Sequence, residues 1–150
     1  MAKFKFPFEN VLRHRKTLEN LAQKEFQTAM SELNQQLDLL EKMKQEKVDA
    51  RKEAYAKQIA GGQAGPALGQ IGDFLKLQDI RIEKHQKKIQ EIEKRVEELR
   101  EILRQRALDS KIIESYKDRK KDDFKLEQKK LEQKQMDDVV SSRFKFGDNE

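Results

Sequence analysis

The residues that could take part in catalysis or metal binding are few and scattered. Cysteine is absent, which excludes disulfides and thiol chemistry. The two histidines, His14 and His85, lie far apart in the chain. The glycine-rich stretch 61–72 lacks the Lys-Ser/Thr pair of a phosphate-binding P-loop and follows no predicted strand. We therefore expect no catalytic residue, no metal site and no cofactor.

Adjacent carboxylates occur in three places, Glu97-Glu98, Asp122-Asp123 and Asp137-Asp138. Paired carboxylates can share acid–base work, but only where a pocket desolvates one of them. These pairs lie in dense charge runs and are expected to be solvated. The sequence predicts a protein that is not an enzyme.

Helix-breaking residues are concentrated in one stretch. Five of the six glycines and Pro66 fall between Gly61 and Gly72, whereas 8–60 and 73–146 contain neither residue type. Inside a helix glycine costs about 1 kcal/mol and proline about 3 kcal/mol relative to alanine. The pattern predicts an all-α fold, two long helices in an antiparallel coiled-coil hairpin. The expected elements of this single domain, 1–150, are a first helix over about 8–59, a turn over 60–72 and a longer second helix over about 73–143, capped by Asp73.

The composition is 41% charged and 35% hydrophobic, which is typical of a coiled coil unless the chain is disordered. Disorder is disfavoured because the apolar residues keep helical spacing. In the first helix a stripe with an eleven-residue period is expected to be buried: Leu18, Ala22, Phe26, Ala29, Leu33, Leu37, Leu40, Lys44, Val48, Arg51, Tyr55 and Ile59. In the second helix the period is a heptad, through Leu75, Gln78, Ile82, His85, Ile89, Ile92, Val96, Leu99 and Leu103, followed by a stutter near 104–110.

Folding the chain about Pro66 predicts which positions face each other. Leu40 is then expected opposite Ile92, Lys47 opposite His85, and Glu9 opposite Asp123. The second helix would continue past the start of the first. That overhang has few apolar residues and would be marginal as an isolated helix.

The net charge of +5 is concentrated in two segments. Residues 1–16 carry five Lys/Arg and one acid, and residues 111–145 carry eleven Lys/Arg and eight acids. An antiparallel hairpin brings both to the same, cationic end. Because acids alternate with the cations there, nucleic-acid binding is disfavoured, although a basic hairpin binding nucleic acid stays open as an alternative.

The N-terminal residues Phe4, Phe6 and Phe8 alternate with Lys3 and Lys5. Such a cluster could bind a membrane surface. We instead expect the three rings to pack on the neighbouring helix. No apolar run is long enough to span a bilayer, and the start lacks the apolar core of a signal peptide, so a cytoplasmic protein is expected. A generic coiled-coil adaptor or spacer remains an alternative for the whole chain.

The opening of the sequence carries a recognisable pattern. The run Phe6-Pro7-Phe8-Glu9-Asn10-Val11-Leu12-Arg13-His14-Arg15, followed by Glu19, resembles the start of the FliJ family, small coiled-coil proteins of the flagellar type III export apparatus. The charged end of the chain is also similar to that family, at Phe124, Glu127, Glu132, Met136-Asp137-Asp138 and Arg143. The resemblance covers nearly the whole chain.

The resemblance implies a non-enzymatic stalk protein that links the hexameric export ATPase to the cytoplasmic domain of the export gate and assists substrate chaperones. Such a protein would be peripheral at the inner face of the cell membrane. It implies a gate-binding surface around Phe74, Gln78, Arg81 and His85, with Gln78 and Arg81 departing from the smaller or apolar residues of the family. For ATPase binding, the residues expected at the open end are Phe6, Phe8, Arg13, Arg15, Lys120, Lys121 and Arg143.

Overall fold

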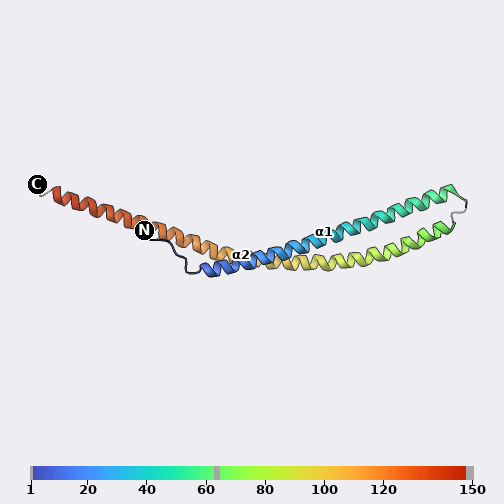
Figure 1. Cartoon of the computed structure of the whole chain (residues 1–150), viewed down its shortest axis with the longest axis horizontal. Helices are drawn as coiled ribbons and strands as arrows, with labels where there is room; N and C mark the ends of the chain where they lie inside the picture. The colour runs from blue at the N-terminus through green and yellow to red at the C-terminus, as the bar shows by residue number, and fades with distance from the viewer. Residues whose placement is uncertain (1, 63–64, 148–150) are drawn as a thin grey trace. The chain divides into compact units, whose positions relative to one another are not determined.

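The protein consists of two helices joined by a short turn (Figure 1). The structure, a computed structural model, describes residues 2–62 and 65–147. Helix α1 runs over Glu9–Ala60 and helix α2 over Gly65–Gly147, and the described residues contain no strand. The expectation of an all-α helical hairpin with a longer second helix is confirmed.

The turn begins with two glycines. Gly61 and Gly62 have φ values of 69° and 76°, in the left-handed region that favours glycine. The Gly61 N–H donates to the carbonyl of Lys57 at 3.3 Å, which closes the last turn of α1. Part of the expected turn over 60–72, residues 63 and 64, lies outside the described residues.

Helix α2 begins at Gly65 rather than near Asp73, so Asp73 lies inside the helix and does not cap it. Pro66 is compatible with this start because its missing N–H is harmless in the first turn. Gly69 and Gly72 disfavour a helix here, but Ile71 between them is half-buried. Helix propensity is a weak preference that tertiary packing overrides.

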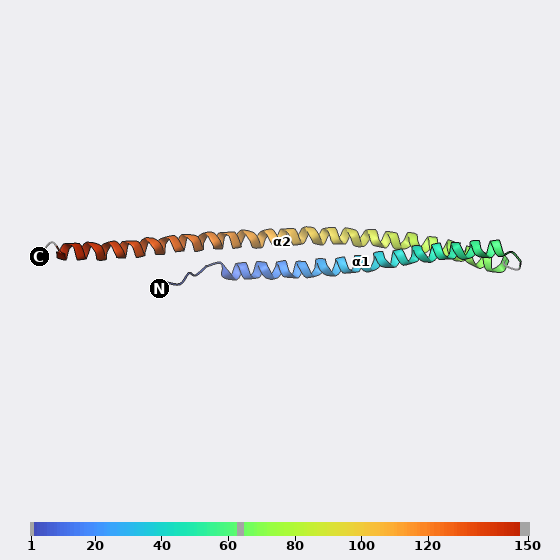
Figure 2. The same ribbon diagram turned by 90° about the horizontal axis from the view of Figure 1, so that it is seen from above.

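The contacts of the chain define two units. One contains Met1–Glu19 and Gln105–Glu150, and the other contains Asn20–Arg104. In the second unit the two helices lie side by side and antiparallel (Figures 1 and 2). Its buried core is made of Ala29, Leu33, Leu40, Ile89, Val96 and Leu99, with Phe26, Met30, Ile82 and Ile92 packed against it.

Towards the turn the seam of the second unit becomes polar. After Leu40 the less exposed positions of α1 are Met43, Lys47, Ala50, Ala54 and Lys57. These continue the heptad spacing of the core, so the expected eleven-residue stripe is wrong at Leu37 and at every position beyond Leu40. The stripe members that the structure exposes are Leu37, Lys44, Val48, Arg51, Tyr55 and Ile59. The heptad is hard to see in the sequence because lysine and alanine occupy its positions.

The register also differs from the expected one. Lys47 forms an ion pair with Asp79, and His85 Nε2 lies 2.9 Å from the carbonyl oxygen of Gln36. Lys47 therefore does not face His85. In the other unit Glu9 pairs with Lys117, not with Asp123. Both ion pairs are centred between Gly62 and Gly65 rather than on Pro66, because the turn is shorter than expected.

The first unit is held by a smaller seam. Leu12 of α1 is buried, and on α2 Ser110 is only 2% exposed. Ser110 continues the heptad of α2 after Leu103 and Arg106, so the expected stutter near 104–110 is absent from this helix. A small serine fills a core position that the sequence pattern presented as a break. Beyond the start of α1, helix α2 continues with no other helix beside it in the described residues (Figure 2).

Candidate interaction surfaces

Three aromatic side chains of the N-terminal segment pack on α2, as expected. Phe6 is buried at 8% exposure, and its ring centroid lies 5.9 Å from that of Tyr116. Phe8 also contacts Tyr116, with centroids 6.1 Å apart. Phe4 lies 5.7 Å from Phe124, further along α2. The segment before α1 is thus an aromatic strap over residues 2–8, bound along the first unit.

Lysine side chains of the strap and of α2 lie near the surface beside the aromatic rings. Lys120 Nζ lies 5.6 Å from the centre of the Tyr116 ring, a cation–π distance. Lys121 lines a groove with Lys5 of the strap and Lys117 of α2. Positive side chains therefore border the aromatic strap on the α2 side.

The arginines expected to bind the ATPase differ in their surroundings. Arg15 is half-buried and donates from Nη1 to the carbonyl of Asp109 at 2.9 Å, so it joins α1 to α2. The side chains of Arg13 and Arg143 are exposed, and neither has an ion pair within the described residues. Arg15 thus has a structural contact, whereas Arg13 and Arg143 are free to meet a partner.

One carboxylate at this end has a perturbed pKa. Lys117 Nζ lies 2.8 Å from Glu9 Oε2. The hydrogen bond from Lys117 lowers the pKa of Glu9, and the positive charges of Lys117, Arg13 and Lys16 act in the same direction. Glu9 is thus held in its charged form at the first turn of α1, where the helix dipole also favours a negative side chain.

The final part of α2 has no partner within the described chain. From Leu131 to Gly147 every residue is exposed. Its large apolar side chains are Leu131, Met136, Val139, Val140, Phe144 and Phe146, exposed by 51% to 79%. Met136, Val140 and Phe144 follow one another every four residues, so they share one side of the helix. A helix with such an uncovered apolar row is typical of a binding segment.

The four residues expected to bind the gate differ in how far they are exposed. Phe74 is half-buried and lines an open groove with Ile71, Glu46, Asp49 and Glu53. Gln78 is only 1% exposed, and its Nε2 donates to the Met43 carbonyl at 3.0 Å and to Glu46 Oε2 at 3.3 Å. The Gln78 side chain is therefore a core group of the second unit. It cannot present itself to a partner without opening the seam.

The other two residues expected to bind the gate, Arg81 and His85, also differ in their exposure. Arg81 is exposed, and His85 is half-buried with its ring bonded to Gln36. The side-chain oxygen of Gln36, Oε1, is buried without a hydrogen-bond partner in the described residues. Only Phe74 and Arg81, with part of His85, are accessible for binding. The described residues contain no group of His, Cys, Asp or Glu arranged to hold a metal ion.

Comparison with protein-family models gives a match over residues 4–146, to the family described as Flagellar FliJ protein. The chain belongs to the FliJ family. Neither the curated proteins nor the solved structures gave a match. Membership confirms the resemblance found in the sequence and supports a role in flagellar protein export. In the described parts of this FliJ-family chain, no helix is long and apolar enough to cross a membrane.

Three residues that contribute to packing in this FliJ-family chain were not identified from the sequence. Tyr116 and Phe124 receive the strap rings, and Ser110 fills the seam. A signal for the aromatic pair existed, since these are the aromatic residues of the second helix closest to the expected position of the strap. No signal singles out Ser110, because a serine in a heptad reads as a solvent-facing residue.

Proposed function

We propose that this FliJ-family protein is a non-enzymatic stalk that couples the hexameric flagellar export ATPase to the cytoplasmic domain of the export gate. In this proposal the first unit binds inside the ATPase ring and the region around Phe74 binds the gate. The protein also assists the handling of substrate chaperones. It works at the inner face of the cell membrane, as a peripheral component of the export apparatus.

The observation that supports this proposal most is the uncovered end of α2. Within a chain that matches its family over residues 4–146, this segment combines an exposed apolar row with exposed cations such as Arg143. Exposed charge pairs are each worth about 0–1 kcal/mol. Contacts of that strength can be exchanged as the ATPase subunits change state, which a stalk inside a working ring requires.

The test compares two triple variants of equal charge change. Arg13, Lys121 and Arg143 are changed to Glu in the first unit, and Lys24, Lys84 and Lys88 are changed to Glu in the second unit as the control. All six side chains are exposed, and none has an ion pair in the described residues. We leave Arg15 unchanged because its hydrogen bond to Asp109 contributes to the fold.

The expected result is that the first variant binds the export ATPase more weakly and stimulates it less, with residual binding that depends less on salt. The control variant should stimulate the ATPase as the unmodified chain does. Circular dichroism checks that both keep their helix content. Equal stimulation by both variants and the unmodified chain across a salt series would refute ring binding by this end.

A further inference from the structure

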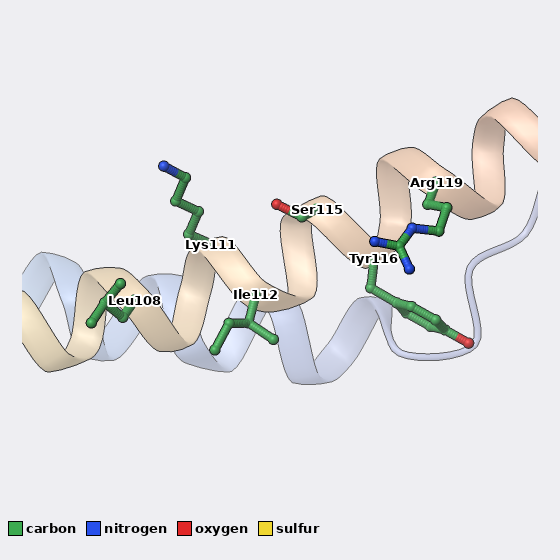
Figure 3. A pocket seen from close by; sticks show the side chains of 6 residues that line it. All are labelled: Leu108, Lys111, Ile112, Ser115, Tyr116 and Arg119. Carbon is green, nitrogen blue, oxygen red and sulfur yellow. The ribbon is translucent and has the colours of Figure 1, made fainter.

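Three side chains of α2 form an exposed apolar row in the first unit. Leu108, Ile112 and Tyr116 are spaced four residues apart and are 42%, 62% and 38% exposed. Figure 3 shows them following one another along one side of the helix. With Lys111, Ser115 and Arg119 they line an open groove of about 520 Å³.

Leu108 and Ile112 are exposed and lie outside the seam between the helices of the first unit, whereas Tyr116 also receives the rings of Phe6 and Phe8. The seam of this unit uses other positions of α2, such as the buried Ser110 and half-buried Ile113. Phe8, which is 45% exposed, contacts Tyr116 and extends the apolar surface at one end. An apolar patch with a polar rim on an otherwise charged surface is typical of an interaction site.

The charges around the groove indicate what would fill it. Its lining contains two cations, Lys111 and Arg119, and no carboxylate. Neither cation has an ion pair within the described residues, whereas the nearby carboxylate of Glu114 lies 3.8 Å from Lys16. An occupant that covers the apolar row must pair these cations with acids, since burying them unpaired is costly.

We infer that this groove binds an amphipathic α-helix of a partner protein, with aliphatic side chains on its inner side and Asp or Glu on its flanks. A row of side chains spaced by four residues is the ridge that packs into the groove of a second helix. The row lies in the first unit but is distinct from Arg13, Lys121 and Arg143, the residues changed in the ATPase test, so the two tests can fail separately.

Two other occupants fit less well. A membrane-binding helix uses a long apolar face, whereas this row has three members within a groove. Asp109 and Asp118 lie in the same stretch of α2 and would repel anionic lipid headgroups and nucleic-acid phosphates. A partner helix whose carboxylates lie only beside Lys111 and Arg119 would avoid this repulsion by Asp109 and Asp118.

The test uses the full chain and a designed fluorescent helix as the probe. The probe has leucines every three or four residues on one side, glutamates flanking them and alanines elsewhere. Fluorescence anisotropy measures its affinity for the unmodified chain and for Ile112→Asn. The matched control is Ile80→Asn, since Ile80 is 51% exposed in the second unit. A second probe has lysine in place of every glutamate.

We expect Ile112→Asn to weaken binding by about tenfold or more, as for a residue at the centre of an interface. Ile80→Asn should bind as the unmodified chain does, and the lysine probe should not bind. Equal losses for both variants, or equal binding of both probes, would overturn the assignment. The assignment would also be overturned by a different set of results. In these, the acidic probe does not bind, the unmodified chain binds phosphatidylglycerol vesicles or duplex DNA, and Ile112→Asn loses that binding. Circular dichroism verifies that each variant stays helical.

Discussion

The side-chain amide of Gln78 donates a hydrogen bond to the main-chain carbonyl of Met43, with 3.0 Å between the two atoms, and is buried between α1 and α2. A polar side chain at a seam position commonly specifies register at some cost in stability. We expect this role for Gln78, because shifting the helices would leave its amide buried and unpaired.

Replacing Gln78 by alanine should lower the stability of the chain. The change removes a bond to Met43 and leaves a gap in the seam, and we expect a loss of about 1–3 kcal/mol in the free energy of unfolding. Gln86→Ala is the control, since Gln86 is exposed on the same helix. Urea unfolding followed by circular dichroism measures both. A loss no larger for Gln78→Ala than for Gln86→Ala would contradict the structural role.

Crosslinking tests the register directly. The ion pairs of Lys47 with Asp79 and Glu9 with Lys117 place Leu33 at the level of Ile92. A chain with Leu33→Cys and Ile92→Cys should therefore crosslink within one molecule when treated with a short thiol-reactive linker. The pair Leu40→Cys and Ile92→Cys, which the sequence favoured, should react more slowly. Faster reaction of the Leu40→Cys and Ile92→Cys pair would instead support the register centred on Pro66.

The ion pair of Glu9 and Lys117 makes a prediction for acid pH. A carboxylate with a lowered pKa stabilises the fold above its ordinary pKa, and the stabilisation is lost as the pH falls through the lowered value. Lys117→Gln should raise the Glu9 pKa towards the ordinary glutamate value of about 4.3. Carbon-13 NMR of the Glu9 carboxyl measures this titration. Lys125→Gln is the control, and an unchanged Glu9 midpoint in Lys117→Gln would show that the bond does not form in solution.

The groove at Phe74 gives a prediction for the proposed gate contact. Phe74→Ala removes the largest apolar side chain of that groove and should weaken binding to the cytoplasmic domain of the export gate by about tenfold. Because Phe74 is only half-buried, the melting temperature should fall little. Leu77→Ala, at a 53% exposed position nearby, is the control. If Phe74→Ala melts far earlier and still binds the gate normally, Phe74 belongs to the core.

The sequence predicted the helices and the strap well because their signals are local. Long runs without glycine or proline indicate helix, and Phe4, Phe6 and Phe8 had to bury their rings somewhere. The register depended on the turn, and the turn was misjudged because packing around Ile71 extends α2 through Gly69 and Gly72. An error of a few residues there changes every partner along the seam.

The candidate binding residues were harder to predict than the fold. The heptad placed Gln78 in the stripe of the second helix and left Arg81 outside it, but the resemblance assigned both to one binding surface although Gln78 is buried and Arg81 exposed. The sequence also did not show that Ser110 is buried in the seam. Burial of a side chain in a two-helix fold depends on register, which is a property of the whole hairpin rather than of a local segment.

The change of the seam from leucines to lysines and alanines after Leu40 has a consequence for motion. A segment with few buried apolar contacts opens at a lower free energy than the rest of its domain. In hydrogen exchange, amide protection should therefore fall from the Leu33 region towards Gly61, and on α2 from Ile89 back towards Gly65. The two helix ends that meet at the turn would separate while the apolar cluster stays closed. A partner could then reach Gln78, which pairs with Met43 beyond that cluster, without unfolding the protein.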